Sequence, residues 1–501
     1  MDKHIRSVAK GGSIVFAGRL FTQGCRLVLA VFLARVLAAE QYGMYSLGLT
    51  VAELVAGLAA LGLGTALVRF IPVFRSREDR AALWGTLQLG VGLPFLLSLL
   101  LAIALYALAN PIAIRLLHEP RMASLLRLIS FLVPFLALND MVAAATRGFR
   151  NMHYTTIAQF IVGPLAKLGL VAGIAIFGLN AARALTAAGL AEIVVAGLLL
   201  YFLSKQIPLG FIFQPGRRDT KELMRFSLPV YLSSLLNNFG AQLQTLILAA
   251  FSNVYNVGIF VLARNVTLIG ELFQRSISMP SQPIFSELFA REKKQELARL
   301  CQATTRWTFA LNLPLSLVAL LLPGPILALF GGSFGVGVLV VVILSWRSIA
   351  HTATSMCAHV IDMTGHTVLK LMNSVVRIGV SVGLCLLLIP RWGAVGAALA
   401  VLIADATEGV LRLIQVFVLF RIVPYDRSFL KPIAAGLIAA AVALAIGPWV
   451  PKEPLPVYAA IHIVIIFSVY LAMSLLLGLT PEERGMLADL RRRASALLAR
   501  S

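Results

Sequence analysis

Two arginines and a glutamine interrupt an apolar stretch near the amino terminus, and side chains of these types can bind an anion. Residues 12–35 are long enough to cross a bilayer, which takes about 20 helical residues. Arg19, Gln23 and Arg26 are four and three residues apart, so they share one face of that helix. An arginine at mid-membrane costs about 2.5 to 3.5 kcal/mol on insertion scales and should face protein or water. The stripe predicts a cationic cavity wall; the alternative is a structural arginine paired with carboxylates or carbonyls of a neighbouring helix.

A second set of polar residues predicts the rest of the substrate site. The predicted seventh span carries a stripe of neutral polar residues, Tyr231, Ser234, Asn238, Gln242 and Thr245. Asn238 and Gln242 are the predicted sugar contacts, and hydrogen bonds that merely join helices are an equal alternative. Arg264, in the eighth span, is expected to join the arginines of the first span.

Carboxylates inside the predicted spans are the candidates for ion coupling: Glu53, Glu192, Glu271 and Asp405. Embedded carboxylates of transporters commonly bind and release a coupling ion. We therefore expect coupling to H⁺ or Na⁺ and no bound cofactor. For Glu53 and Glu271 a structural role is an equal alternative. Glu408 precedes Arg412 by four residues on the face of Asp405, which favours an internal ion pair there.

Motifs of catalysis and metal binding are missing from the sequence. It has no phosphate-binding loop for ATP, no His or Cys cluster with metal-ligand spacing, and no Ser-His-Asp arrangement at a nucleophile elbow. The four cysteines are scattered through apolar segments. We therefore predict that the protein is not an enzyme, with no catalytic residues and no metal site.

The composition shows which elements must position these residues. The chain has 501 residues, of which 59% are hydrophobic and 13% charged, and its mean hydropathy is +0.89. Such a composition is typical of a polytopic helical membrane protein. The net charge of +21 is explained by Lys and Arg in short loops, as membrane topology requires, so we expect no nucleic-acid partner.

The fold class predicted from these patterns is an all-α polytopic membrane protein with about fourteen transmembrane helices. With the amino terminus in the cytoplasm, the cytoplasmic side collects about 25 Lys and Arg residues and the far side about 6. Both termini are therefore predicted to be cytoplasmic, and the first span is expected to be retained. The spans are predicted to begin near residues 12, 44, 81, 122, 154, 183, 222, 254, 300, 336, 368, 393, 428 and 455.

Internal similarity divides the chain into two pseudo-symmetric halves. Gln41-Tyr42-Gly43-Met44-Tyr45 parallels Asn256-Val257-Gly258-Ile259-Phe260, and Glu192 parallels Asp405. Parallel repeats of six helices would be related by an axis along the membrane normal. A separate amphipathic surface helix is predicted at 280–300. The predicted domains are a six-helix lobe at 1–203, a cytoplasmic linker at 204–221, a second six-helix lobe at 222–421, helices 13 and 14 at 422–478, and a basic amphipathic cytoplasmic tail at 479–501.

Four segments, LAAEQYGMYSLGLT, LGLGTALVRFIPVFR, PIFSELFAREKKQELARL and GHTVLKLMNSVVRIGVSVGLCLLLIPRWGAVGAALA, resemble a known family. The family that they resemble is that of the oligosaccharide flippases of the multidrug/oligosaccharidyl-lipid/polysaccharide exporter superfamily. The resemblance implies two six-helix lobes around a central cavity, with two extra helices. It also implies movement of polyprenyl-diphosphate-linked oligosaccharide across the plasma (bacterial inner) membrane for cell-surface polysaccharide biosynthesis. Membrane lipids, polysaccharide polymerase and glycosyltransferases are the partners that this function implies.

Two other substrates agree with the same fold. A lipid II flippase would also use fourteen helices and a cationic cavity. A multidrug or organic-cation antiporter would have twelve helices and should carry carboxylates rather than Arg19 and Arg26 in its first lobe, because a cationic cavity repels cations.

Overall fold

The structure of the protein is a computed structural model. We describe residues 2–149, 151–207, 242–451 and 453–478, with positions 216, 227, 231, 235 and 240. Side chains of the first helix are described from residue 20 onward. Arg19 and Asn238 of the predicted substrate site, the tail 479–501 and most of the linker 204–221 therefore lie outside the described part.

Helices account for nearly all of the described residues, and no strand occurs in these ranges. They form two compact units, unit 1 (Met1–Leu262 with Ser381–Ala400) and unit 2 (Ala263–Val380 with Val401–Ser501). The predicted lobe and linker boundaries stay predictions.

Unit 1 begins with a long helix that bends and continues through a bundle of apolar helices. Its elements are α1 (Asp2–Ala59), α2 (Leu63–Ser76), α3 (Arg80–Ala107), α4 (Ala109–Pro111), η1 (Ile112–Leu116), α5 (Met122–Ser130), α6 (Val133–Gly148), α7 (Met152–Thr155), η2 (Thr156–Val162), α8 (Gly163–Ala175), α9 (Ala181–Ser204) and most of α11 (Val254–Thr267).

Unit 2 takes up the chain within α11 and ends with a pair of long apolar helices. Its elements are η4 (Leu268–Gly270), α12 (Glu271–Ala290), α13 (Lys294–Leu321), α14 (Pro323–Ala328), η5 (Gly332–Gly337), α15 (Val338–Met363), both ends of α16 (Thr367–Phe420), η6 (Arg427–Phe429), α17 (Leu430–Ile446), η7 (Gly447–Trp449) and α18 (Leu455–Leu476).

Nine apolar segments of the described chain are long enough to cross a membrane. Two of them, Leu20–Ala59 and Val368–Phe420, are far longer than a bilayer requires. Each contains one non-helical residue, Ala38 (φ 56°) in α1 and Gly393 (φ 51°) in α16. These bends coincide with the predicted borders between spans one and two and spans eleven and twelve. Together with the solved-structure comparison below, these segments confirm an all-α polytopic membrane protein.

The predicted surface helix at 280–300 is wrong. Residues up to Ala290 complete α12, a tight turn follows, and Lys294 already begins α13. Lys293 Nζ lies 2.7 Å from Glu296 Oε1, an exposed pair that spans the junction. The amphipathic pattern therefore comes from the polar ends of two long helices that the turn at 291–293 joins.

Local signals explain where several helices begin and how they pack. Asp79 accepts a hydrogen bond from the backbone of Ala82 at the start of α3, and Asn180 does the same for Arg183 at the start of α9. In the π-turn η2 the carbonyl of Phe160 accepts a hydrogen bond from Thr22 Oγ1 at 2.8 Å. This bond fixes the first helix against the fifth predicted span.

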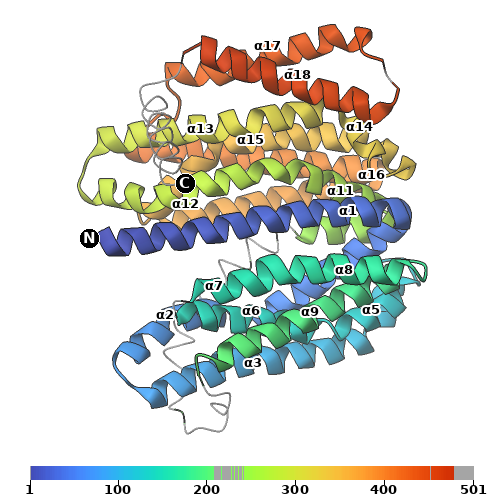
Figure 1. Ribbon diagram of the computed structural model, residues 1–501, viewed down its shortest axis with the longest axis vertical. Helices are drawn as coiled ribbons and strands as arrows, with labels where there is room; N and C mark the ends of the chain where they lie inside the picture. The colour runs from blue at the N-terminus through green and yellow to red at the C-terminus, as the bar shows by residue number, and fades with distance from the viewer. Residues whose placement is uncertain are drawn as a thin grey trace, which may run out of the picture. The chain divides into compact units, whose positions relative to one another are not determined.

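Each unit has its own apolar core. In unit 1 the core lies between α2, α3, α6 and α9, where Leu67, Leu87 and Leu199 are fully buried. In unit 2 one core joins α13 to α17 and α18 through Phe309, Phe429 and Tyr470. Figure 1 shows α17 and α18 side by side as an antiparallel pair. The predicted thirteenth and fourteenth helices thus pack within unit 2 against α13.

Candidate functional site

Arg26 lies on the face of α1 that packs inside unit 1. Thr22, four residues earlier, and Leu29, three residues later, are both buried, and this spacing puts all three on one face. Arg26 itself is exposed. Two large side chains that are 53% and 60% exposed, Leu20 and Val28, point to other sides of the helix. Arg26 is therefore accessible without belonging to the apolar surface that suits lipid.

Gln242 and Glu53 are brought together in unit 1. Gln242 Nε2 donates to Glu53 Oε2 at 3.0 Å. Tyr231, on the same predicted stripe, donates its hydroxyl to the carbonyl of Leu58 at 2.6 Å. Glu53 and Leu58 lie in the second part of α1, so the stripe faces that part. The predicted sugar contact Gln242 and the predicted coupling residue Glu53 share one polar site.

Two carboxylates of unit 1, Glu53 and Glu192, each lie within electrostatic range of Asp140. Glu192 Oε1 is 3.8 Å from Lys167 Nζ, and its Oε2 accepts from Asn139 Nδ2 at 2.9 Å. Among the described residues Glu53 and Asp140 have no Lys or Arg within ion-pair distance. Arg147 lies within electrostatic range of Asp140, so the first unit offers an accessible arginine together with one carboxylate, Glu53, that is bound to a neutral amide.

Asp140 is the residue that the sequence analysis did not single out. It stands in the apolar segment Met122–Gly148 and is exposed, while its neighbour Asn139 is buried. The signal was present in the sequence, since the pair Asn139-Asp140 interrupts an apolar span as Arg26 does. The carboxylates near Asp140 on other helices, Glu53 and Glu192, could however be recognised only from the fold.

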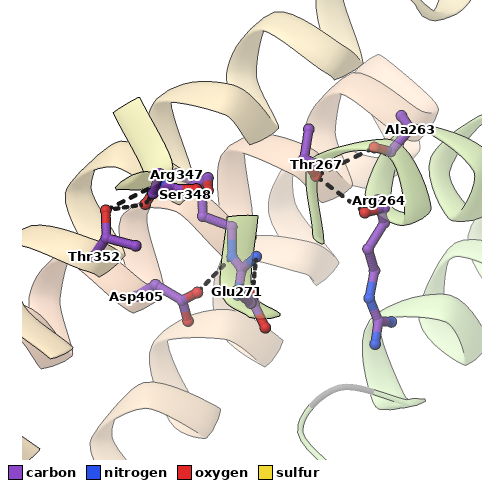
Figure 2. Close-up of polar contacts among 9 residues, drawn as sticks. Ala263, Arg264, Thr267, Glu271, Arg347, Ser348, Thr352 and Asp405 are labelled. Carbon is purple, nitrogen blue, oxygen red and sulfur yellow. Dashed lines mark hydrogen bonds and ion pairs between the residues drawn. The ribbon is translucent and has the colours of Figure 1, made fainter. Parts of the chain in front are cut away.

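The predicted coupling residues of unit 2, Glu271 and Asp405, bind the same arginine. Arg347 of α15 lies between them, with Nε 2.6 Å from Asp405 Oδ2 and Nη1 3.4 Å from Glu271 Oε1 (Figure 2). We call these three residues the Arg347 network. All three side chains are mostly buried, at 8% to 17% exposed.

A break in the predicted eighth span positions Glu271. The short turn η4 ends at Gly270, and α12 begins with Glu271. A Cβ at Gly270 would lie 1.5 Å from Asn312 Oδ1 of α13, so only glycine allows this approach. Asn312 in turn donates to Ser348 Oγ and Thr352 Oγ1, each at 3.1 Å. Buried hydrogen bonds thus hold the carboxylate beside α15.

A second charged group in unit 2 confirms the ion pair predicted from the sequence. Arg412 Nη2 is 2.5 Å from Glu408 Oε1, and Arg377 Nε is 3.4 Å from Glu408 Oε2. Glu408 is almost completely buried. Counted together with the Arg347 network, three carboxylates meet three arginines, so the charges in this part of unit 2 balance.

Arg264 does not join the Arg347 network. Figure 2 shows its guanidinium directed away from Glu271, Arg347 and Asp405. Its backbone carbonyl accepts from Thr267 Oγ1 at 3.1 Å. The substrate and coupling roles assigned from the sequence stay predictions. No group of three or more His, Cys, Asp or Glu suited to a metal ion occurs among the residues described.

A family model and two curated relatives match parts of this chain. The family model described as "Polysaccharide biosynthesis protein" matches residues 8–289, more than half of the chain. The capsular polysaccharide biosynthesis protein CapF of Staphylococcus aureus is 25% identical over 41% of this chain and 52% of its own. The succinoglycan biosynthesis transport protein ExoT of Rhizobium meliloti is 26% identical over 53% of this chain and 49% of its own. The chain thus spans about half the length of these two relatives.

Among solved structures, the lipid II flippase MurJ in an inward closed conformation matches with a TM-score of 0.73. The match covers 94% of this chain and 98% of MurJ at 14% identity. At that identity the likeness shows the fold alone, and the fold is the one that the spans predicted.

Proposed function

Because this chain belongs to the family of polysaccharide biosynthesis proteins, we propose that it moves a polyprenyl-diphosphate-linked oligosaccharide across the membrane by alternating access. The movement runs from the inner to the outer leaflet of the plasma membrane, with both termini in the cytoplasm. Relatives whose names include polysaccharide biosynthesis and transport support this assignment. Polysaccharide polymerase and glycosyltransferases are the expected partners.

The observation that carries the proposal is the exposure of Arg26 on the inward face of α1. A diphosphate brings about two negative charges, and their desolvation in hydrocarbon would be prohibitive without compensation. A guanidinium stays charged at physiological pH and binds phosphate oxygens with two parallel hydrogen bonds. Arg19, seven residues and about two helical turns earlier on the same face, supplies a second guanidinium.

Neutral polar groups and carboxylates complete the mechanism. Gln242 contacts sugar hydroxyls and, through its bond to Glu53, links glycan binding to a carboxylate. Glu53 and Glu192 take up H⁺ or Na⁺, because unit 1 carboxylates have fewer cationic partners than those of unit 2. Glu271 and Asp405 already share Arg347, so they gain less from a further cation and hold α12, α15 and α16 together.

Complementation of a host that lacks its own oligosaccharide flippase tests the proposal. Arg26→Ala should reduce surface polysaccharide at least tenfold, and Arg26→Lys should retain part of the activity, because lysine keeps the charge but loses the bidentate geometry. Arg115→Ala is the matched control, since Arg115 is an exposed arginine of unit 1 outside the membrane-spanning segments.

Protein amounts are compared by immunoblot in every strain. Wild-type polysaccharide export by the double variant Arg19→Ala/Arg26→Ala would contradict the cationic site. Rescue of a strain that lacks lipid II flippase, without rescue of oligosaccharide export, would agree with the cationic site. It would identify lipid II as the substrate in place of the lipid-linked oligosaccharide.

The unit 1 carboxylates favour a second candidate, an organic-cation antiporter. Glu53 and Asp140 can attract a cation, and a likeness of fold does not exclude such a substrate. Under this alternative the protein would confer resistance to cationic dyes, and Arg26→Ala would increase that resistance by removing a repulsive charge. Unchanged dye resistance on expression of the wild-type protein would reject it.

A further inference from the structure

Gly43 and Gly258, the glycines of the repeated motif, contact each other's helices in the same way. A Cβ at Gly43 would lie 1.8 Å from the carbonyl oxygen of Val254, and one at Gly258 would lie 2.1 Å from that of Ala39. Val254 stands four residues before Gly258, and Ala39 stands four before Gly43. The second part of α1 and α11 therefore cross with local two-fold symmetry, as expected for related repeats.

At this crossing the backbones of α1 and α11 lie in direct contact at both glycines. Real Cβ atoms essentially never approach within 3.0 Å, so no other residue fits at either glycine without separating the helices. Ala39, Val254 and Val257 around the contact are buried. Close backbone packing of this kind depends on dispersion and weak C–H···O contacts. Contact at the two glycines therefore depends on how closely the backbones of α1 and α11 approach each other.

The motif also ties each glycine to a later helix. Gln41, two residues before Gly43, accepts the backbone N–H of Ala181 at 2.8 Å, where α9 begins. Asn256, two residues before Gly258, lies against Gly393 at the bend of α16, where an added Cβ would be 2.7 Å from Asn256 Nδ2. Movement at the crossing must therefore involve the start of α9 and the bend of α16.

We propose that the Gly43–Gly258 crossing is the extracytoplasmic gate of the protein and is closed in this structure. The inference rests on the proposed function, because a gate serves alternating access. With the amino terminus in the cytoplasm, the second and eighth spans both begin at the extracytoplasmic surface, where the glycan must leave. The headgroup passes only when the crossing separates.

Cysteine labelling tests the gate directly. Ala39→Cys, placed under the crossing in a Cys25→Ser background, reports opening through its reaction with a membrane-impermeant maleimide added from outside. Gly258→Ala or Gly43→Ala should raise the labelling rate at least tenfold and lower polysaccharide export at least tenfold. Gly57→Ala is the matched control on the same helix, because a Cβ there meets nothing within 4 Å.

An unchanged labelling rate in a Gly258→Ala protein that is present in normal amounts would overturn the gate. Labelling needs no substrate, so a raised labelling rate together with a wild-type protein that fails to restore polysaccharide in complementation would keep the gate and reject the glycan as substrate.

A second measurement leaves both glycines in place, in case their variants fail to fold. Ala39→Cys alone should be labelled at least fivefold faster when the host supplies lipid-linked oligosaccharide than when its synthesis is blocked. Equal rates, with an exposed reporter such as Thr186→Cys labelled normally, would show that the crossing does not open during transport.

Discussion

At the scale of single residues, the embedded charges fall into two groups with different surroundings. In unit 2 an arginine lies 2.5 to 3.4 Å from each of the carboxylates Glu271, Asp405 and Glu408. In unit 1 Glu53 is bound to a neutral amide, and the lysine partner of Glu192 is 3.8 Å away. Paired buried charges stabilise a fold chiefly because removal of one partner is costly, whereas weakly paired ones remain available to a mobile cation.

The Arg347 network should therefore respond to substitution as a structural unit. Arg347→Leu leaves Glu271 and Asp405 together without a cation and should destabilise the protein by about 3 to 5 kcal/mol. Thermal unfolding in detergent, followed by fluorescence-detected size exclusion, measures the loss. Adding Glu271→Gln and Asp405→Asn should restore much of it. Arg291→Leu is the control, because its pair with Glu287 is exposed and worth about 0 to 1 kcal/mol; equal losses would contradict this account.

Glu53 should behave differently, because its role is functional. Glu53→Gln keeps a polar partner for Gln242, so the protein should accumulate normally, but export should fall at least tenfold and lose its response to an imposed H⁺ or Na⁺ gradient. Comparison of the two gradients identifies the ion. The exposed Glu287→Gln serves as control. Export by Glu53→Gln that still follows the same gradient would remove Glu53 from the coupling mechanism.

At the scale of elements, breaks in helices position the charged side chains. The turn η4 lets Glu271 begin α12 opposite α15, and the hydrogen bond from Thr22 Oγ1 to the Phe160 carbonyl in the π-turn η2 orients α1. The irregular turns thus connect sequence to site geometry.

Gly270→Ala tests this link. The added methyl group would overlap Asn312 Oδ1, so α12 must shift and Glu271 must move from Arg347. We expect a lower unfolding temperature and at least fivefold less export. The second change Asn312→Ala should recover part of the stability by removing the overlap. Gly324→Ala, where nothing lies within 4 Å of the new methyl group, should have no such effect. Equal behaviour of Gly270→Ala and Gly324→Ala would exclude the close approach.

Long apolar spans could be predicted well from the sequence, because hydrophobic length is a local property. The starts near 122, 254 and 455 agree with α5, α11 and α18. The junction at 291–293 could not be predicted from the sequence, because the polar ends of two helices give the same pattern of polar and apolar residues as one amphipathic surface helix. The roles of Asp140 and Arg347 follow from neighbouring charged residues that are 50 or more positions away in the sequence. Only the fold shows that those residues lie close.

At the scale of the whole molecule, the repeated sequence motif has a structural counterpart. Gly43 and Gly258 make reciprocal contacts, Gln41 reaches the start of α9, and Asn256 lies against the bend of α16. Halves related in this way suit a mechanism in which near-rigid bundles rock about a shared site. In the proposed mechanism such rocking moves a diphosphate-linked glycan past Arg26.

Reconstitution in liposomes tests that claim most directly. Purified protein is incorporated with a fluorescent polyprenyl-diphosphate disaccharide, and a membrane-impermeant quencher reports the fraction in the outer leaflet. We predict ion-gradient-dependent movement by the wild-type protein and by Arg115→Ala, with a rate at least tenfold lower for Arg26→Ala. Movement of the glycolipid at the same rate by Arg26→Ala and wild-type protein, or none by wild-type protein that transports an organic cation in the same liposomes, would contradict the account.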